Sequence, residues 1–235
     1  MTALFLVLST ALLLGALHAF DADHLAAVTV FIARRPAPLA ALSFALRWGM
    51  GHAATLLAVG SAAAFLRLTI TPDLEAAAEM AVGLMLVAVG AWALHGISRG
   101  RLLIEQHLHG EHGEHRHTHL HRPDHSLTSR HSIFWVGALH GLAGSAGLLV
   151  IIPVGMMSSV GTVIAWIVTF NVGVSIAMGL YAMAIGGIFT RLSGNPSTGG
   201  GGWYMWLAGA AGTATVLLGL FWIGQTVVGL AGRGA

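Results

Sequence analysis

Long apolar runs separated by short polar or proline-containing breaks dominate the chain. These runs cover residues 3–32, 38–66, 78–98, 132–154, 160–190 and 203–230. A helix of about 20 apolar residues is long enough to cross a bilayer. The pattern therefore predicts an all-α polytopic membrane protein with about six transmembrane helices. The first, second and fifth runs are longer than a crossing needs, which predicts tilted, kinked or protruding helices.

Composition agrees with this class. Hydrophobic residues make up 56% of the chain and charged residues only 9%, whereas an ordinary soluble domain has about 25% charged residues. The chain contains no cysteine, which excludes disulfides, thiolate catalysis and cysteine-ligated metals. No basic segment precedes the first apolar run, so we expect a retained helix there and not a cleaved signal peptide.

The arginines predict how the helices are oriented. On one side of a six-helix arrangement lie Arg34, Arg35, Arg99, Arg101, Arg116, Arg122, Arg130 and Arg191; on the other lie Arg67 and Arg233. Loops rich in basic residues stay in the cytoplasm. We therefore expect a multi-pass protein of the cytoplasmic membrane with both termini outside. The basic balance indicates this topology and not a nucleic-acid partner.

The first apolar run contains four ionisable residues in its middle, in the heptapeptide HAFDADH at residues 18–24. A charge at mid-membrane costs about 2.5–3.5 kcal/mol, so such residues usually face a partner, an ion or water. On one continuous helix, His18, Asp21 and His24 would share an arc of about 120°, and Asp23 would point elsewhere. Histidine with carboxylate suits nickel, cobalt or zinc. The alternative is that these residues only brace one helix against another.

The second run adds Arg47 and His52. If the first two runs form an antiparallel hairpin, His18 lies at the depth of His52, and Asp23 at the depth of Arg47. We predict that His18 and His52 converge on one ion and that Asp23 and Arg47 form a structural salt bridge. For His52 the alternative is a hydrogen bond to a backbone carbonyl.

The two halves of the chain share short sequence features. Gly-Ala-Leu-His occurs at residues 15–18 and again at 137–140. Further correspondences pair Gly49 with Gly173, Gly83 with Gly212, and Gly90 with Gly219. Three helices in each half would give the halves opposite orientations, which predicts a 3+3 inverted repeat. The repeats would be residues 1–98 and 132–235, with a loop at 99–131. The alternative is chance, because glycine, alanine and leucine are common here.

The second half has not kept the charges of the first. Residues 143–146 read Ala-Gly-Ser-Ala where residues 21–24 read Asp-Ala-Asp-His. We therefore predict an asymmetric metal site, in which the first half supplies most of the ligands and the second half contributes His140. Asn171, in the fifth run, could be a ligand or a helix–helix hydrogen bond, and the sequence does not decide between them. His95 is expected at a solvated helix end.

The loop at 99–131 is rich in histidine. Its predicted metal-capturing residues are His107, His109, His112, His115, His117, His119 and His121. No apolar periodicity supports a fold there, so we expect disorder. Neutral imidazoles at such spacings bind divalent ions. We interpret the loop as an auxiliary metal buffer; a dispensable solvated linker is the alternative.

The heptapeptide at 18–24 resembles the H-x4-D-H hallmark of the nickel/cobalt transporter (NiCoT) superfamily. Residues 48–52, Trp-Gly-Met-Gly-His, are similar to that family's second conserved element. The resemblance implies secondary transport of Ni²⁺ or Co²⁺ as substrate, with no cofactor. It implies that His18, Asp21, Asp23, His24 and His52 select the metal. The family's usual eight helices and its Asp-Thr-Ala-Thr-Glu element are missing, so the chain looks more like the urease-accessory-permease branch.

The resemblance favours uptake, and efflux through the same site is the alternative because a histidine-rich loop is also typical of the efflux branch. An intramembrane metal hydrolase would need a general base beside the metal, and the chain has no His-Glu-x-x-His. We therefore expect no enzymatic activity. The expected partners are a divalent transition-metal ion and the lipid bilayer, and no nucleic acid. The sequence does not decide whether the chain forms a homo-oligomer or has a cytoplasmic nickel chaperone as a partner.

Overall fold

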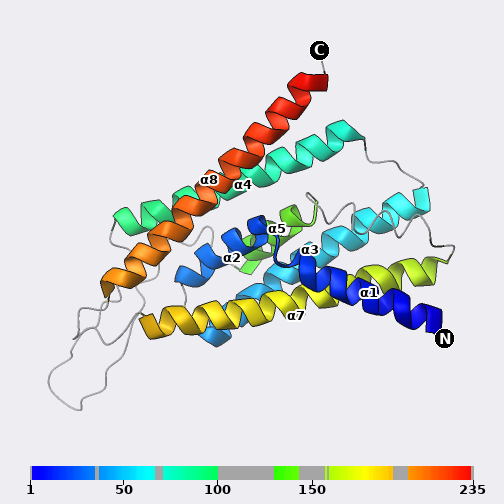
Figure 1. Ribbon diagram of the computed structural model, residues 1–235, viewed down its shortest axis with the longest axis horizontal. Coiled ribbons are helices and arrows are strands. Elements are labelled where there is room, and N and C mark those ends of the chain that lie inside the picture. Colours follow the sequence, from blue (N-terminus) through cyan, green and yellow to red (C-terminus); the bar gives the residue numbers. More distant parts are fainter. Residues whose placement is uncertain are drawn as a thin grey trace.

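The chain forms a bundle of helices (Figure 1). The computed structural model describes residues 2–34, 37–66, 71–99, 130–142, 157, 159–192 and 201–233. The helices are α1 (Thr2–His18), α2 (Ala22–Arg34), α3 (Pro38–Leu66), α4 (Pro72–Ser98), α5 (Arg130–His140), α7 (Val160–Leu192) and α8 (Gly201–Arg233). These described residues contain no strand, so the predicted all-α fold is confirmed. The histidines predicted to capture metal, at residues 107–121, lie outside the described residues.

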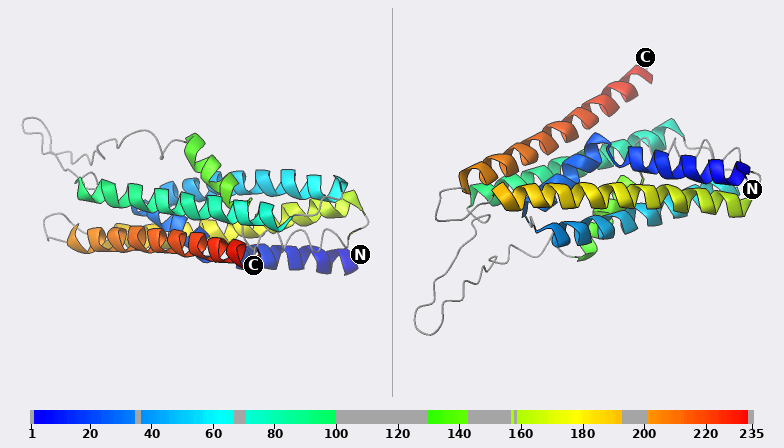
Figure 2. Two further views of the ribbon diagram at one scale, coloured as in Figure 1. Left: turned by 90° about the horizontal axis from the view of Figure 1, so that it is seen from above. Right: turned by 60° about the horizontal axis from the view of Figure 1, so that its bottom comes forward.

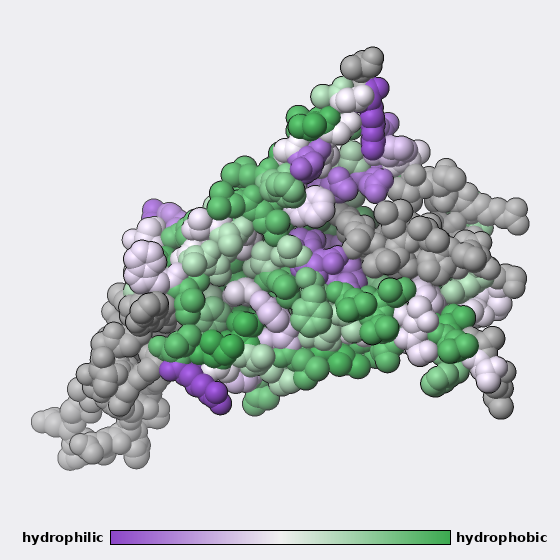
Figure 3. Space-filling model, in the orientation of Figure 1, coloured by the Kyte–Doolittle hydropathy of each residue, from purple (hydrophilic) through white to green (hydrophobic). Residues whose placement is uncertain are grey.

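The described helices have the length and surface of membrane spans. Three of them, α4, α7 and the part Met205–Arg233 of α8, are long and apolar enough to cross a bilayer, and α1 with α2 adds a fourth if the bent pair is one span. On α7, Val168, Val172, Ile176 and Leu180 recur every four residues and are exposed. Figure 3 shows a broad hydrophobic surface on the visible face. Such a surface suits lipid, and the chain is an all-α membrane protein. The count of six spans stays a prediction.

The first apolar run is not one helix, so the predicted continuous helix over 3–32 is wrong. It breaks after His18 and bends by 60° between α1 and α2. The amide of Asp21 donates to the carbonyl of His18 (3.0 Å), and the amide of Leu25 donates to the carbonyl of Asp21 (3.1 Å). Asp21 thus stands at the N-cap of a new helix, a position that aspartate favours. The predicted arc of His18, Asp21 and His24 on one helix face does not exist.

The longer helices pack in pairs, and the short helix α2 lies among them. α4 packs mainly against α8, α1 against α7, and α3 against both α7 and α5. Two hydrogen bonds hold α2 in the interior: the Thr29 and Tyr181 hydroxyls lie 2.6 Å apart, and the Thr215 hydroxyl donates to the carbonyl of Ala26 (3.3 Å). The right view of Figure 2 shows the C-terminal end of α8 pointing away from the other helices. The middle of α2 is therefore held from both α7 and α8.

Glycines let the paired helices touch backbone to backbone. A Cβ at Gly15 would collide with the backbone of Phe170, and a Cβ at Gly137 would collide with the backbone of Trp48. The two contacts are equivalent in sequence, because Gly137 stands 122 positions after Gly15 and Phe170 stands 122 positions after Trp48. Small residues at such positions are what close helix approach in a membrane requires.

A second pair of glycine contacts repeats the same spacing. A Cβ at Gly173 would collide with the carbonyl of Leu12, and a Cβ at Gly51 with the carbonyl of Phe134. These residues are again 122 positions apart, which pairs Gly173 with Gly51 and not with the predicted Gly49. Between α4 and α8, Gly83 faces Gly219 and Gly90 faces Gly212. The two halves therefore exchange equivalent contacts.

Candidate metal centre

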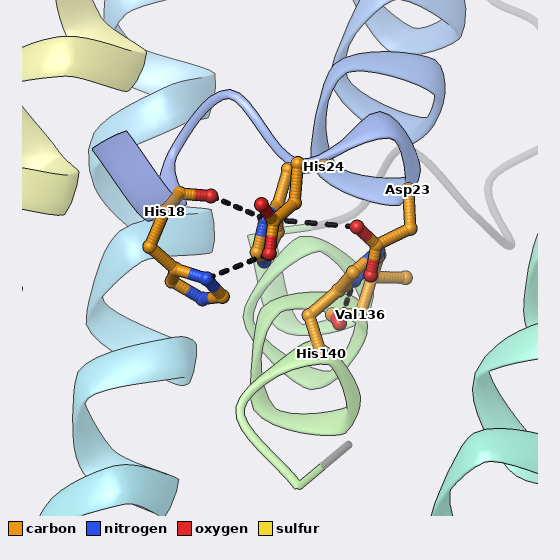
Figure 4. Close-up of polar contacts among 6 residues, drawn as sticks. His18, Asp23, His24, Val136 and His140 are labelled. Carbon is orange, nitrogen blue, oxygen red and sulfur yellow. Dashed lines mark hydrogen bonds and ion pairs between the residues drawn. The ribbon is translucent and has the colours of Figure 1, made fainter. Parts of the chain in front are cut away.

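Four histidines from four helices gather in the interior of the bundle. Figure 4 shows three of them, His18, His24 and His140. His18 ends α1, His24 lies in α2, His52 in α3, and His140 ends α5. All four are buried, with at most 3% of their surface exposed. The ring centroids of His18 and His24 are 4.6 Å apart, those of His24 and His140 5.2 Å, and those of His18 and His52 5.5 Å. His24 stands at the centre of the group.

Each of these rings is held by a hydrogen bond at Nδ1. The Nδ1–H of His24 donates to the carbonyl of His18 (3.2 Å), and that of His140 donates to the carbonyl of Val136 (2.9 Å). His52 donates to the side-chain oxygen of Asn171 (3.1 Å). His18 pairs with the carboxylate of Asp21 (2.8 Å). Carbonyl and carboxylate oxygens only accept hydrogen bonds, so the proton of each neutral ring is on Nδ1.

The opposite nitrogen of these rings, Nε2, is available to bind a metal ion. The Nε2 atoms of His24, His52 and His140 are buried and have no hydrogen-bond partner within the described part of the chain. With the proton on Nδ1, each Nε2 carries a lone pair. A buried polar atom without a partner is costly. This arrangement, a hydrogen-bonded Nδ1–H and an unpartnered Nε2 lone pair, is the one that metal-ligating histidines use.

Two groups of side chains have the spacing of a metal-ligand set. Ligand atoms of His18, His24 and His52 all lie within 4.8 Å of one another, and so do those of Asp21, Asp23 and His24. The side chain of Asp21 is 39% exposed and that of Asp23 11%. The carboxylates therefore lie at the outer edge of the cluster, and the imidazoles lie inside. The assignment of these residues as metal ligands stays a prediction.

The predicted salt bridge between Asp23 and Arg47 is wrong. Among the ion pairs of the described residues, Asp23 pairs with His24 at 3.8 Å and none joins it to Arg47. The bend after His18 is the reason, because it places Asp23 in the first turn of α2. Figure 4 shows Asp23 on the side of the cluster where His140 lies. Asp23 therefore adds negative charge to the histidine cluster instead of neutralising an arginine.

Two helices end at histidines of this cluster, and the terminal carbonyl of His18 accepts a hydrogen bond from His24. α1 ends at His18 and α5 ends at His140, and the amides that follow close the two ends in the same way: Ala19 bonds to Gly15, and Gly141 to Gly137, each at 3.1 Å. The C-terminus of a helix carries a partial negative charge of about half an elementary charge. Broken membrane helices use such ends to coordinate cations. The local field therefore favours a cation.

Comparison with known proteins finds a relative of similar length. Over 190 residues the protein is 26% identical to a urease accessory protein, UreH, from Bacillus sp. (strain TB-90), and the match covers 78% of each chain. No protein-family model matches the sequence. No solved structure matches it either.

Aromatic rings enclose the cluster. Trp48 is fully buried, stacks on His52 at 5.4 Å with 26° between the planes, and meets His24 edge-on at 5.0 Å. Phe170 is also fully buried, and its ring centroid lies 5.5 Å from that of His18. Rings at these positions exclude water from the imidazoles, which strengthens electrostatic interactions there.

The sequence did not predict three parts of this centre. It did not foresee the helix break, although aspartate two residues before another acidic residue is a helix-start signal. It gave Trp48 no role in the metal centre, and the ring contacts three histidines, His24, His52 and His140. For His52 it offered a backbone carbonyl as the alternative partner, and the partner is Asn171. Of these, only the break had a local signal, because the others depend on which helices meet.

Proposed function

We propose that this protein is a permease that moves Ni²⁺, and Co²⁺ as a second ion, across the cytoplasmic membrane through the histidine cluster. The observation that carries the proposal is the set of buried imidazoles whose Nδ1 atoms are all bonded and whose Nε2 atoms at His24, His52 and His140 lack partners among the described residues. In an apolar bundle, a divalent cation is the group that satisfies such lone pairs.

The substrate ion would exchange its water for protein ligands as it enters the cluster. Asp21 and Asp23, at the edge, attract the hydrated cation. The imidazoles of His18, His24 and His52 then replace water with nitrogen ligands, which nickel accepts readily. His140 completes or gates the coordination from the second half. The carbonyl ends of α1 and α5 offset part of the cation's lost hydration.

The relative supports nickel as the metal. It is named a urease accessory protein, and urease is a nickel enzyme, so a permease that supplies nickel fits that name. Metal preference between Ni²⁺ and Co²⁺ follows from geometry as well as ligand type. We therefore propose nickel first and cobalt as the competing substrate.

We further propose that the halves form a 3+3 inverted repeat, with both termini outside and the histidine-rich loop in the cytoplasm. Support comes from the glycine contacts that recur at a spacing of 122 residues. Support also comes from the matching ends of α1 and α5 at His18 and His140. An odd number of spans per half makes the second repeat antiparallel to the first, and transport sites lie at the interface of such repeats.

Nickel flux into proteoliposomes tests the function directly. We expect the wild-type protein to accumulate Ni²⁺ inside sealed vesicles, and we expect His18→Ala and His52→Ala to lose this flux, because each removes an imidazole from the inner group. Hydrolytic turnover without ion flux would instead indicate a metal hydrolase. In cells, uptake raises the nickel content, and a lowered content with nickel resistance would reverse the proposed direction.

Deleting residues 105–125 tests the histidine-rich loop. We expect this deletion to leave the maximal rate unchanged at saturating nickel and to lower the rate at limiting nickel, because a buffer acts by raising the local ion concentration. Radioactive nickel uptake over a concentration series measures both regimes. A complete loss at saturating metal would show that the loop belongs to the transport path.

A further inference from the structure

The polar contact between α3 and α7 inside the cluster involves a residue with no assigned role. His52 is fully buried, and its Nδ1–H donates to the Oδ1 of Asn171 at 3.1 Å. Asn171 is 95% buried and lies in α7, on the opposite half of the chain from His52. This side-chain bond therefore links the two halves at the level of the candidate metal centre.

The amide of Asn171 is itself locked in orientation. Its Nδ2 donates to the carbonyl of Ile167, one turn earlier in α7, at 2.8 Å. An amide nitrogen only donates and an amide oxygen only accepts. Since the nitrogen is committed to Ile167, the oxygen faces His52. The orientation of the amide is therefore set by the backbone of α7, before any ion arrives.

This orientation determines which nitrogen of His52 can bind an ion. An accepting oxygen at Nδ1 requires the Nδ1–H tautomer, which leaves the lone pair on Nε2. The Nε2 of His52 is buried and lacks a hydrogen-bond partner among the described residues. Without Asn171 the ring could take the other tautomer or rotate, and the lone pair would then not be presented to His18 and His24.

We propose that Asn171 is a positioning residue of the transport site: its side-chain oxygen holds His52 in the Nδ1–H tautomer and aims Nε2 at the ion. This inference rests on the proposed nickel transport. Asn171 belongs to neither candidate ligand group of the described residues and acts through His52. In this proposal Asn171 is not itself a metal ligand. Its hydrogen bond to His52 joins α3 to α7 and also orients the His52 ring, which is the ligand.

The test removes the acceptor and keeps the volume. Asn171→Leu has no acceptor, and Asn171→Asp keeps an oxygen at the same place. We expect Asn171→Leu to raise the Ni²⁺ dissociation constant by about 10- to 100-fold, the range for partners that orient metal-bound histidines. We expect Asn171→Asp to restore wild-type affinity. Titration calorimetry on the purified full chain measures these constants. Asn171→Ala serves as the acceptor-free variant if the leucine variant does not fold.

A matched control and a metal-free readout make the test specific. Ser175 lies one turn further along α7, where its hydroxyl faces Gly49, and Ser175→Ala should bind nickel like the wild type. ¹⁵N NMR of the histidine rings reports the tautomer without metal. We expect a protonated Nδ1 for His52 in the wild type and in Asn171→Asp, and a mixture of tautomers in Asn171→Leu.

The outcomes separate the two proposals. Wild-type nickel affinity and an unchanged His52 tautomer in the acceptor-free variants would overturn the role of Asn171. A loss of affinity that also occurs in the His52→Ala background would overturn it too, because a residue acting through His52 has no effect once that ring is removed. Absence of nickel binding in the wild type would overturn the proposed function, while the tautomer measurement would still decide the role of Asn171.

Discussion

Replacing His24 with alanine should abolish nickel transport. His24 is the only ring of the four that contacts all three others within 5.5 Å among the described residues, and it belongs to both candidate ligand groups. Its loss removes a ligand and opens a hole beside Trp48. Changing a residue that merely orients a metal ligand already costs about 10- to 100-fold, so we expect roughly a 100-fold or greater loss of nickel affinity. Proteoliposome flux and calorimetry measure the two effects.

His95→Ala is the matched control for this experiment. His95 is exposed at the end of α4, as the sequence predicted, and it lies in neither candidate ligand group of the described residues. We expect this variant to transport nickel at the wild-type rate. If His24→Ala transports as well as His95→Ala, the buried imidazoles are structural and the proposed transport path lies elsewhere.

Replacing Gly137 with alanine should unfold or loosen the bundle. The added Cβ would overlap the carbonyl of Trp48, which belongs to the backbone of α3 and cannot swing aside. Overpacking of this kind costs about 1–3 kcal/mol. For a chain of this length that corresponds to a fall in Tm of roughly 2–12 °C. Nickel flux should fall as well, because Trp48 packs on His52 and His24. Thermal unfolding in detergent measures the stability.

Gly187→Ala makes the same chemical change where there is room. A Cβ at Gly187, in α7, would meet nothing within 4 Å. Alanine is the better helix former by about 1 kcal/mol, so we expect the Tm of this variant to stay the same or rise. Equal Tm values for the two variants would mean that α3 and α5 are not in backbone contact, and the close packing described for Gly137 would be incorrect.

Much of the fold follows from local sequence patterns. Apolar runs long enough to cross a bilayer predicted α3, α7 and α8 to within three residues of their bounds, and α4 except for its first six residues. Hydropathy succeeds here because each membrane helix satisfies its own backbone hydrogen bonds and needs no partner to do so. The same argument identified the heptapeptide at 18–24 as unusual, because four ionisable residues in an apolar run demand compensation.

The tertiary structure decided where those residues point. At Asp21 the chain can either continue the first helix or cap a new one, and in the structure it caps a new one. The apolar pattern of the sequence does not distinguish these two possibilities. For this reason the pairing of Asp23 with Arg47 was predicted and is not formed. The meeting of His52 with Asn171, 119 residues apart, depends on α3 packing against α7.

By itself, then, the sequence determined that the protein is helical and apolar and that histidine and aspartate lie deep within it. Hydropathy and residue chemistry are properties of single segments, so they can be read along the chain. Only the packing of α1, α2, α3, α5 and α7 brought four imidazoles together and gave each an Nδ1 partner. Ring orientation depends on hydrogen bonds between residues that the sequence places far apart, and it arises only when the helices meet.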